Sequence, residues 1–335
     1  MELKNKRKKI VVIGGGTGTF TVLLGLKQIP NLDISVIVSM MDSGGSNRVI
    51  RDEFGLLPTS DIRQCILALS SDNTDEVIRR LFNYRYTQGT GISGMTFGNL
   101  FMAALTDILK SQKKAIEETS RILDVSGKVI PVTFDNSQLI ATYDNGIQVL
   151  GEHFIDEPSK KTIYHKITNL EVFPSAKINS DASKAIVEAD LIILGPGDLY
   201  TSILCNIVVD GMAKKVFKSK AKKLYIANLM TRFGQTDGFG LKEHIEEIEK
   251  YLGKDSLNYC LFNQTEKISR KAIQWYKSND VEPVIDNYKG RVRVIKKDLV
   301  SNKFYKQSKS DKLVRSLIRH DSGKLAKAIV KILEQ

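Results

Sequence analysis

The segment KIVVIGGGTGTF, residues 9–20, decides how this chain folds. Residues 9–13 form a short, mostly β-branched run, as expected of a strand buried in a parallel sheet, and residues 20–28 have the pattern of a helix. The glycines between them let the backbone approach a phosphate, and the start of the helix offers unpaired N–H donors. This order of elements predicts the opening of a nucleotide-binding α/β fold.

The glycine loop differs from the two best-known phosphate loops. It lacks the Gly-Lys-[Ser/Thr] of a Walker A loop, and Thr19 stands where the G-x-G-x-x-G pattern requires glycine. A purely structural turn between strand and helix is the alternative. The residues that we expect to contact a phosphate are Gly14, Gly15, Gly16, Thr17, Gly18 and Thr19.

The pattern of a strand followed by a glycine-rich or polar loop returns along the chain. Further strands are expected at residues 34–40, 191–194, 223–227 and 257–262, and helices at 61–70, 99–109, 116–123 and 323–333. Between them, residues 129–133, 138–143 and 164–169 are expected to form short, partly antiparallel strands. We therefore predict an α/β, Rossmann-like, doubly wound and mostly parallel sheet with a partly antiparallel and helical insertion in the middle.

Composition excludes several other classes of protein. A chain of 335 residues with 42% hydrophobic and 26% charged residues buries a real core and is neither disordered nor collagen-like. Cys65, Cys205 and Cys260 lie far apart, which gives no zinc or thiol redox motif and fits a reducing compartment. We see no signal peptide and no apolar run long enough for a membrane span, so we expect a cytoplasmic protein.

The net charge of +12 lies at the two ends of the sequence. Residues 1–9 hold five basic residues and one acidic residue, and residues 289–335 hold fourteen basic and four acidic residues, so the body between them is slightly acidic. The basic tail has no interleaved aromatic side chains that could stack on bases. We expect no specific nucleic-acid binding, and a basic tail that folds back over a bound anion.

Ligands of an open parallel sheet bind beyond the carboxyl ends of its strands, so the loops there are the candidates for function. Asp42 follows a strand and is placed to hold ribose hydroxyls or a divalent cation, while a plain turn is the alternative. Asp61 and Asn99 stand at helix starts, either as caps or as ligand contacts. The other candidates are Ser43, Gly44, Gly45, Gly195, Pro196, Gly197, Asn228, Thr231 and Asp237.

Seven pieces run in order through almost the whole chain: GGGTGT (14–19), DSGGSNR (42–48), FGLLPTSDIR (54–63), FGNLFMAAL (97–105), GPGDLYTSI (195–203), NLMTRFGQTDGF (228–239) and RHD (319–321). Together they resemble a known superfamily, the gluconeogenesis factors (YvcK-like) and their relatives, the 2-phospho-L-lactate transferases (CofD-like) of deazaflavin-coenzyme biosynthesis. The last three pieces resemble the gluconeogenesis factors more than the transferases.

The resemblance implies one CofD-like domain over residues 1–335, with a nucleotide-binding half at 10–125, an insertion at 126–180 and a C-terminal half at 181–335. It implies a nucleotide or nucleotide-sugar ligand, with UDP-N-acetylglucosamine as the expected type, and a link to cell shape and peptidoglycan synthesis on gluconeogenic carbon sources. It also implies that Arg319 binds the ligand and that Ser322 is a phosphorylation site. We expect a homo-oligomer.

The sequence departs from the family pattern at three places. Ser43 stands where the family usually has a second acid, which puts a two-carboxylate metal site in doubt. Met95 replaces a frequent histidine, and Arg232-Phe233-Gly234 replaces the more usual Gln-Pro-Gly. These changes favour a divergent subgroup with an altered ligand.

Two functions therefore compete, and whether the chain is an enzyme stays open. The first is a nucleotide-sugar-binding regulator that needs no reaction. The second is a Mg-dependent transferase that moves a phospho-acyl group from a nucleotide diphosphate donor, in which Asp42 and Asp61 would be the catalytic metal ligands. A dinucleotide oxidoreductase ranks third, because no His or Tyr-Lys pair is placed for hydride transfer.

Overall fold

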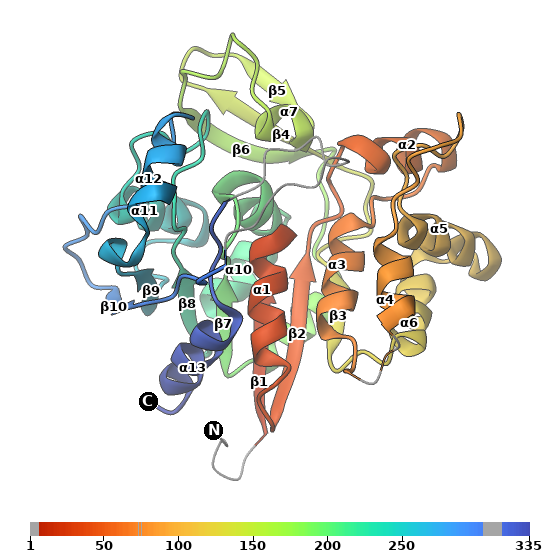
Figure 1. The fold of residues 1–335 in the computed structure, drawn as a ribbon, viewed down its shortest axis with the longest axis horizontal. Coiled ribbons are helices and arrows are strands. Elements are labelled where there is room, and N and C mark those ends of the chain that lie inside the picture. The colour runs from red at the N-terminus through yellow and green to blue at the C-terminus, as the bar shows by residue number, and fades with distance from the viewer. Residues whose placement is uncertain (1–6, 73, 75, 304–316) are drawn as a thin grey trace.

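A computed structural model describes residues 7–72, 74, 76–303 and 317–335. A seven-stranded sheet in the order β10-β9-β8-β7-β1-β2-β3 runs through the molecule, and every neighbouring pair is parallel (Figure 1). Its strands are β1 (Lys8–Ile13), β2 (Leu32–Val38), β3 (Lys128–Pro131), β7 (Leu191–Leu194), β8 (Lys222–Ile226), β9 (Tyr259–Asn263) and β10 (Arg293–Lys297). The strand order reverses at β1, which confirms the Rossmann-like prediction.

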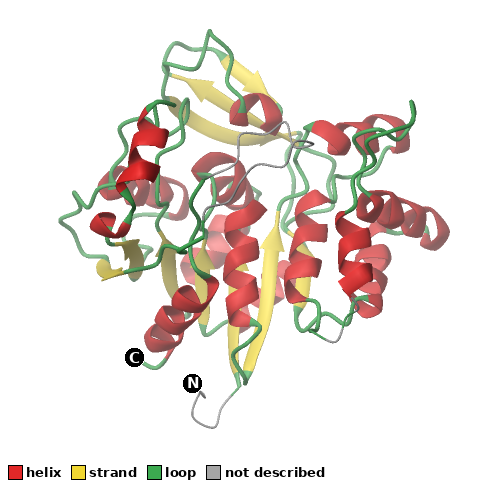
Figure 2. Cartoon of the chain, in the orientation of Figure 1, coloured by secondary structure: helices red, strands yellow, loops and turns green. Residues whose placement is uncertain are grey.

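Helices cover both faces of this sheet (Figure 2). Ile10 and Val12 of β1 pack under one layer, and Val11 and Ile13 pack under the other, which is why the strand is aliphatic throughout. The first layer contains α1 (Gly16–Leu26), α3 (Ser60–Leu69) and α13 (Ser322–Leu333), and the second contains α8 (Ser180–Glu188), α10 (Met212–Lys218) and α11 (Leu241–Leu252). The helices α4 (Glu76–Asn83), α5 (Phe97–Leu109) and α6 (Gln112–Ile122) pack beside α3.

A small antiparallel sheet lies over the carboxyl ends of the large sheet, at the top of Figure 1. It contains β4 (Gln138–Tyr143), β5 (Gln148–Leu150) and β6 (Ile167–Phe173), together with the short helix α7 (Glu152–Asp156). Of the three short strands expected in this part of the chain, the one at residues 129–133 lies outside the antiparallel sheet. That segment is β3, which pairs parallel with β2 and extends the large sheet. Val129 and Ile130 point to opposite faces of the sheet and pack into the hydrophobic cores on its two sides.

Several elements are not evident from the sequence. The helix α1 begins at Gly16, so the second half of the expected glycine loop is in fact the first turn of the helix. The helix α2 (Gly45–Phe54) buries only Asn47 and Ile50, and α4 buries only Phe82, so neither shows a clear apolar period. The remaining short elements are η1 (Leu199–Leu204), α9 (Cys205–Ile207), η2 (Thr265–Lys267) and α12 (Arg270–Lys277).

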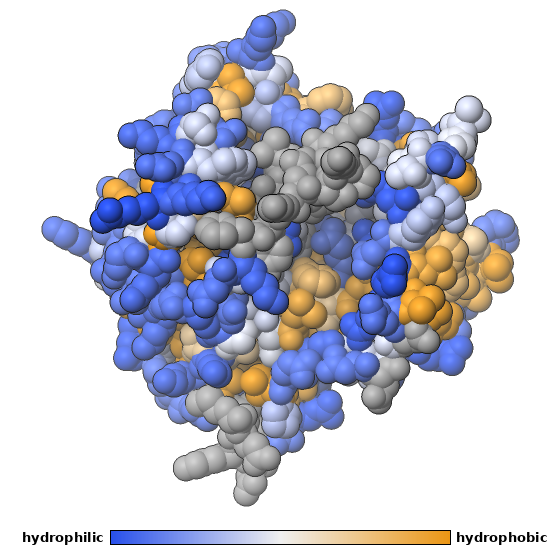
Figure 3. Space-filling view, viewed as in Figure 1, coloured by the Kyte–Doolittle hydropathy of each residue, from blue (hydrophilic) through white to orange (hydrophobic). Residues whose placement is uncertain are grey.

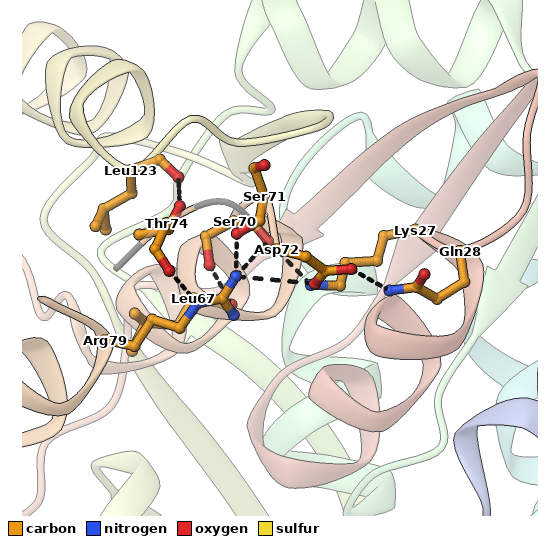
Figure 4. A network of polar contacts seen from close by, with 9 residues as sticks. All are labelled: Lys27, Gln28, Leu67, Ser70, Ser71, Asp72, Thr74, Arg79 and Leu123. Atoms are coloured by element: carbon orange, nitrogen blue, oxygen red, sulfur yellow. Dashed lines mark hydrogen bonds and ion pairs between the residues drawn. The ribbon is translucent and has the colours of Figure 1, made fainter. Parts of the chain in front are cut away.

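A polar network ties the ends of α1 and α3 to the start of α4 (Figure 4). The ammonium of Lys27 donates to the Ser70 carbonyl oxygen at 2.9 Å and to Asp72 Oδ1 at 2.8 Å, and Gln28 Nε2 donates to Asp72 Oδ2 at 3.1 Å. Arg79 Nη2 donates to the same Ser70 carbonyl oxygen at 3.1 Å. The Lys27 side chain is only 6% exposed, so the network closes the helix layer at the end remote from the glycine turn.

Candidate functional site

The candidate site lies where the loops after β1, β2, β7 and β8 meet beneath the small sheet. At its centre, the start of α1 packs tightly against neighbouring backbone. A Cβ on Gly18 would lie 2.1 Å from the Pro196 carbonyl oxygen, and a Cβ on Gly15 would lie 2.1 Å from Asp61 Oδ2. Only glycine fits at both positions, so this turn holds two loops and a carboxylate against the helix start.

The N-terminus of α1 has no capping side chain. Gly15 is its N-cap residue and has no side chain to cap it, so the first N–H groups depend on other partners. The Asp61 carboxylate accepts a hydrogen bond from the Gly16 N–H. Burial, followed by the charge of Asp42, raises the pKa of Asp61 to about 7.

A chain of hydrogen bonds holds the Asp42 carboxylate. Asp42 Oδ1 accepts from the Gly44 N–H at 2.8 Å, and Oδ2 accepts from the amide of Asn47. The Ser60 hydroxyl donates to Asn47 Oδ1 at 2.8 Å and accepts from Asn99 Nδ2 at 3.0 Å. Asp42 is thereby oriented from α3 and α5 as well as from its own loop.

Asn99 lies at the far end of this chain. Its Oδ1 accepts from Arg63 Nε at 3.1 Å, and its side chain is fully buried. Asn99 is the third residue of α5 and Asp61 the second of α3, so neither is the N-cap residue of its helix. The amide of Asn99 donates to the hydroxyls of Ser46 and Ser60, so its side chain is held by partners within the protein.

The small sheet adds acids that the sequence analysis did not select. Glu152, the first residue of α7, is hydrogen-bonded to Asp42. The His153 N–H beside it donates to the Ser43 hydroxyl at 3.1 Å. The Ser43 hydroxyl therefore holds α7 against the loop after β2. Glu152 brings a second carboxylate close to Asp42, next to residue 43, where the family usually has a second acid.

Asp42, Asp61, Glu152, Asp156 and Asp198 form what we call the carboxylate cluster. Burial is the largest cause that raises the pKa of Asp42, Asp198 and, most strongly, Glu152, and the charges of neighbouring members raise each pKa further. Such mutual repulsion is typical of sites that bind a cation or a proton.

Arg232 is the counter-charge of the cluster. Its Nη2 lies 3.0 Å from Asp156 Oδ2, and Gln235 Nε2 donates to Asp156 Oδ1 at 3.1 Å. Burial lowers the pKa of Arg232, but the carboxylates of Asp198 and Asp156 raise it by more. The departure from the family pattern at residue 232 thus has a structural role, because it joins the loop after β8 to the small sheet.

The other candidates in that loop have partners within the protein. Asn228 Nδ2 donates to the Gly197 carbonyl oxygen at 2.9 Å and so links two candidate loops. The Thr231 hydroxyl accepts from the Glu282 N–H at 3.0 Å, and Asp237 Oδ2 accepts from the Gly234 N–H at 2.7 Å. Asn228 lies with the glycine loops, while Thr231 and Asp237 shape their own loop.

The RHD segment, residues 319–321, contacts the chain just after β8. His320 is buried and hydrogen-bonded to the backbone of Ala227, directly after that strand, and Arg319 precedes it. Ser322 is the half-exposed first residue of α13, and a Cβ on Gly25 would lie 2.1 Å from its carbonyl oxygen. Gly25 is nine residues after Gly16, roughly 13 Å along α1, so Ser322 lies away from the glycine turn.

Two expectations fall partly outside the described residues. The basic tail that we expected to cover a bound anion includes residues 304–316, and the basic leader includes residues 1–6, neither of which the structure describes. Within the described ranges, no helix is long and apolar enough to cross a membrane.

The donors of the carboxylate cluster suit a magnesium ion that is shared with a ligand. In the described part of the chain, no three His, Cys, Asp or Glu side chains converge as a complete metal site. Mg²⁺ usually needs only one or two carboxylates, because waters and substrate phosphates supply the other oxygens. Asp42 and Asp61, which lie close enough to perturb each other electrostatically, fit that mode.

The chain is similar to known proteins over nearly its whole length. The family model described as 2-phospho-L-lactate transferase CofD matches residues 10–304. The gluconeogenesis factor of Listeria monocytogenes is 35% identical over 336 residues, which cover 98% of this chain and 97% of that protein. That of Halalkalibacterium halodurans is 34% identical over 97% of this chain and 96% of its own length. A crystal structure of a Bacillus halodurans protein superposes with a TM-score of 0.88 at 33% identity, covering 97% of this chain and all of that one.

Proposed function

This chain belongs to the CofD family and, within it, to the gluconeogenesis factors, and from that premise we propose that it is a nucleotide-sugar-binding regulator. Its ligand would be a nucleoside diphosphate sugar of the UDP-N-acetylglucosamine type. Its role would be cytoplasmic and linked to cell shape and peptidoglycan synthesis on gluconeogenic carbon sources.

The observation that carries this proposal is the packing at the start of α1. Backbone atoms of Gly15 and Gly18 are approached so closely that side chains are excluded, and the helix begins on a residue without a capping side chain. A diphosphate there would accept hydrogen bonds from N–H groups and gain from the helix dipole. In the proposal, Arg319 reaches the diphosphate from the RHD segment, since a guanidinium pairs bidentately with phosphate.

The carboxylate cluster sets a condition on this binding. A diphosphate brought beside several carboxylates is repelled unless a cation lies between them. In the proposal, Asp42 and Asp61 hold Mg²⁺, and the ion when bound would neutralise the phosphate charge. Asn228 would position the loop after β7, and Asp61 would release the Gly16 N–H to the ligand.

Binding should be tested by thermal unfolding with UDP-N-acetylglucosamine, UDP-glucose, GDP and NAD, each with and without Mg²⁺. A ligand at 100 times its Kd stabilises by about 2.7 kcal/mol. We expect a Tm increase with UDP-sugars that Arg319→Ala removes and that Arg293→Ala, an exposed arginine on β10, retains. A UDP-sugar response that is identical in both variants would contradict the role of Arg319, and no response to any nucleotide would contradict the proposal.

The second candidate is a Mg-dependent transferase of the 2-phospho-L-lactate transferase type. The hydrogen bond between Glu152 and Asp42, with Asp61 nearby, favours it, because paired carboxylates beside a metal-bound diphosphate are what such a transfer needs. A Tm response confined to guanine nucleotides with Mg²⁺, and turnover that Asp42→Asn abolishes, would replace the regulator by this enzyme.

Two further parts of the proposal concern regulation and assembly. Phosphorylation of Ser322 would place a negative charge at the N-terminus of α13, where the helix dipole favours it. A homo-oligomer would cover the apolar surface at the right of Figure 3, in the region of α5. Val77 of α4 and Ile108 of α5 are among the exposed large hydrophobic side chains. Light scattering should detect the oligomer, and Val77→Asp should dissociate it.

A further inference from the structure

A pocket of about 460 Å³ lies against the large sheet, between α6 and α8, and none of the nucleotide-site candidates lines it. Its floor is formed by β1, β2 and β3, and its two walls are the facing sides of α6 and α8. The volume lies within the range of small-molecule sites. The pocket exists because α8 packs over β1 and β3 while α6 stands beyond the sheet edge, so no helix fills the space over the start of β2.

The sequence of β2 is adapted to this pocket. The residues that face the opposite helix layer are Ile34, Val36 and Val38, all of them aliphatic. On the pocket side the same strand has Asp33 and Ser35, and Ser35 is only 9% exposed. A strand buried on both faces normally carries aliphatic residues on both. The two polar side chains of β2 therefore indicate that water reaches the floor of the pocket. Apolar residues at the rest of the lining are Val11, Ile116, Ile130, Phe134 and Ala185.

Charges divide the pocket into two ends. Around the last turn of α8, Lys9 Nζ lies 2.6 Å from Glu188, and Lys128 and Lys184 stand close to the same carboxylate. The hydrogen bond from Lys9 lowers the pKa of Glu188 most, and the charges of Lys184 and Lys128 lower it further. With Asp33 included, three lysines face two carboxylates, so this end is positive.

The other end has the opposite sign. At the first turns of α6 and α8, Lys113 Nζ lies 2.6 Å from Asp181. Glu117, one helical turn after Lys113, adds a second carboxylate. Both acids raise the pKa of Lys113, and Asp181 has the larger effect. Two carboxylates around one lysine make this end negative. Asp181 and Glu188 are seven residues apart on α8, so the two ends are separated by about 10 Å.

We propose that this pocket is a second ligand site and that it binds a small zwitterion with an apolar middle. The anionic group of the ligand lies by Lys128 and Lys184, its ammonium group lies by Glu117 and Asp181, and its methylene or apolar side-chain atoms lie on Val11 and Ile130. An ω-amino acid or a short dipeptide has this chemistry. A singly charged molecule leaves one end of the pocket without a partner and binds more weakly.

The test is isothermal titration calorimetry of the full chain with 6-aminohexanoate, whose charges are separated by a flexible apolar chain. Hexanoate and hexylamine serve as singly charged controls of the same length. We expect saturable binding of 6-aminohexanoate in the range of about 1 mM and at least tenfold weaker binding of either control. Equal binding of hexanoate or hexylamine, or no heat from 6-aminohexanoate, would overturn the proposal.

Three variants locate the binding in this pocket. Lys184→Met removes a charge from an exposed position of α8, and Lys214→Met removes an exposed lysine from α10 as its matched control. We expect Lys184→Met to weaken 6-aminohexanoate binding about tenfold and Lys214→Met to leave it unchanged. Ser35→Leu fills the floor and should abolish the heat. If all three variants bind as the parent chain does, the ligand lies elsewhere and the assignment is wrong. None of these outcomes depends on nucleotide binding, so this proposal and the proposed function fail separately.

Discussion

At the scale of single residues, the candidate site depends on neutral side chains that orient charged ones. A chain of hydrogen bonds links Arg63 to the Asp42 carboxylate through Asn99, Ser60 and Asn47 in turn. Each of these groups makes at least one of its hydrogen bonds with its neighbour in the chain. Removing a member in the middle therefore takes a hydrogen bond away from buried polar groups on both sides.

Asn99→Leu tests this arrangement with little change of volume. It removes the partners of Arg63 Nε and of the Ser60 hydroxyl, and we expect the free energy of unfolding to fall by about 2–3 kcal/mol. Urea unfolding measures the change, with the exposed Asn302→Leu as control. Equal stability of the two variants would show that the chain of hydrogen bonds does not support the fold.

His320 predicts how the protein responds to acid. Burial lowers the pKa of His320 to about 4, while the hydrogen bond with Ala227 partly opposes this shift. Below pH 6.5 the unfolded chain binds a proton at His320, whereas the folded chain does not until the pH approaches 4. The stability that the neutral, buried His320 contributes is therefore fully present above pH 6.5 and is lost as the pH falls towards 4. The shift corresponds to about 3 kcal/mol.

The comparison is urea unfolding at pH 7.5 and pH 4.5 for the parent chain, His320→Gln and His165→Gln. We expect His320→Gln to lose much less stability than the parent on acidification. His165 is partly exposed, and its variant controls for the loss of a histidine elsewhere in the chain; it should lose as much stability on acidification as the parent does. The same acid sensitivity in all three proteins would assign it to other groups.

The sequence predicted the contiguous part of the site and missed the rest, for a physical reason. The glycine loop and Asp42 follow directly from strands, and the carboxyl ends of neighbouring parallel strands meet at one edge. Glu152 and Asp156 belong to a short helix of the small sheet, and only the docking of that sheet onto Ser43 and Arg232 brings them to the site. Spacing along the chain carries no signal for such docking.

At the scale of elements, the start of α1 is fixed by how closely another loop approaches it. Alanine at an ordinary helix position is better than glycine, but at Gly18 the added Cβ would lie 2.1 Å from backbone oxygen of Pro196. Either α1 or the loop after β7 must shift. The position of the helix relative to that loop is therefore set by the absence of a single methyl group.

Gly18→Ala should lower the free energy of unfolding by about 1–3 kcal/mol and abolish the Tm response to nucleotides. The matched control is Gly91→Ala, whose added Cβ meets no atom within 4 Å. We expect the control to stay within about 0.5 kcal/mol of the parent chain. Nucleotide binding that survives Gly18→Ala would place the ligand away from this turn.

Elements were predictable where burial imposes a period. The aliphatic runs of β1 and β7 are buried on both faces, and their sequences show it. The helix α2 is mostly exposed and begins with a glycine in the left-handed region, so its sequence resembles a loop. The sequence left open how β3 pairs, because a four-residue apolar strand has no feature that distinguishes parallel from antiparallel pairing.

At the scale of the whole molecule, stability and ligand binding are supported at different places. The network around Lys27 lies at the end of the helix layer away from the glycine turn (Figure 4). Lys27→Met leaves the Ser70 carbonyl oxygen with one partner fewer, and we expect a loss of about 1–2 kcal/mol in the free energy of unfolding. The increase in Tm on nucleotide binding should stay as large as in the parent chain, and a smaller increase would mean that the two ends are coupled.

The position of β1 also determines when the protein can fold during synthesis. β1 is an interior strand of the sheet, and it pairs with β2 on one side and β7 on the other, with Ile10 aligned to Leu191. Its second neighbour is made roughly 180 residues after it, a large sequence separation that slows folding. A nascent chain that has emerged only to the end of β3 therefore has β1-β2-β3 with the β1 edge still lacking its partner β7 and half of its apolar faces uncovered. Until β7 leaves the ribosome, that edge is free to pair with another chain, so the growing polypeptide should need chaperone protection over this interval.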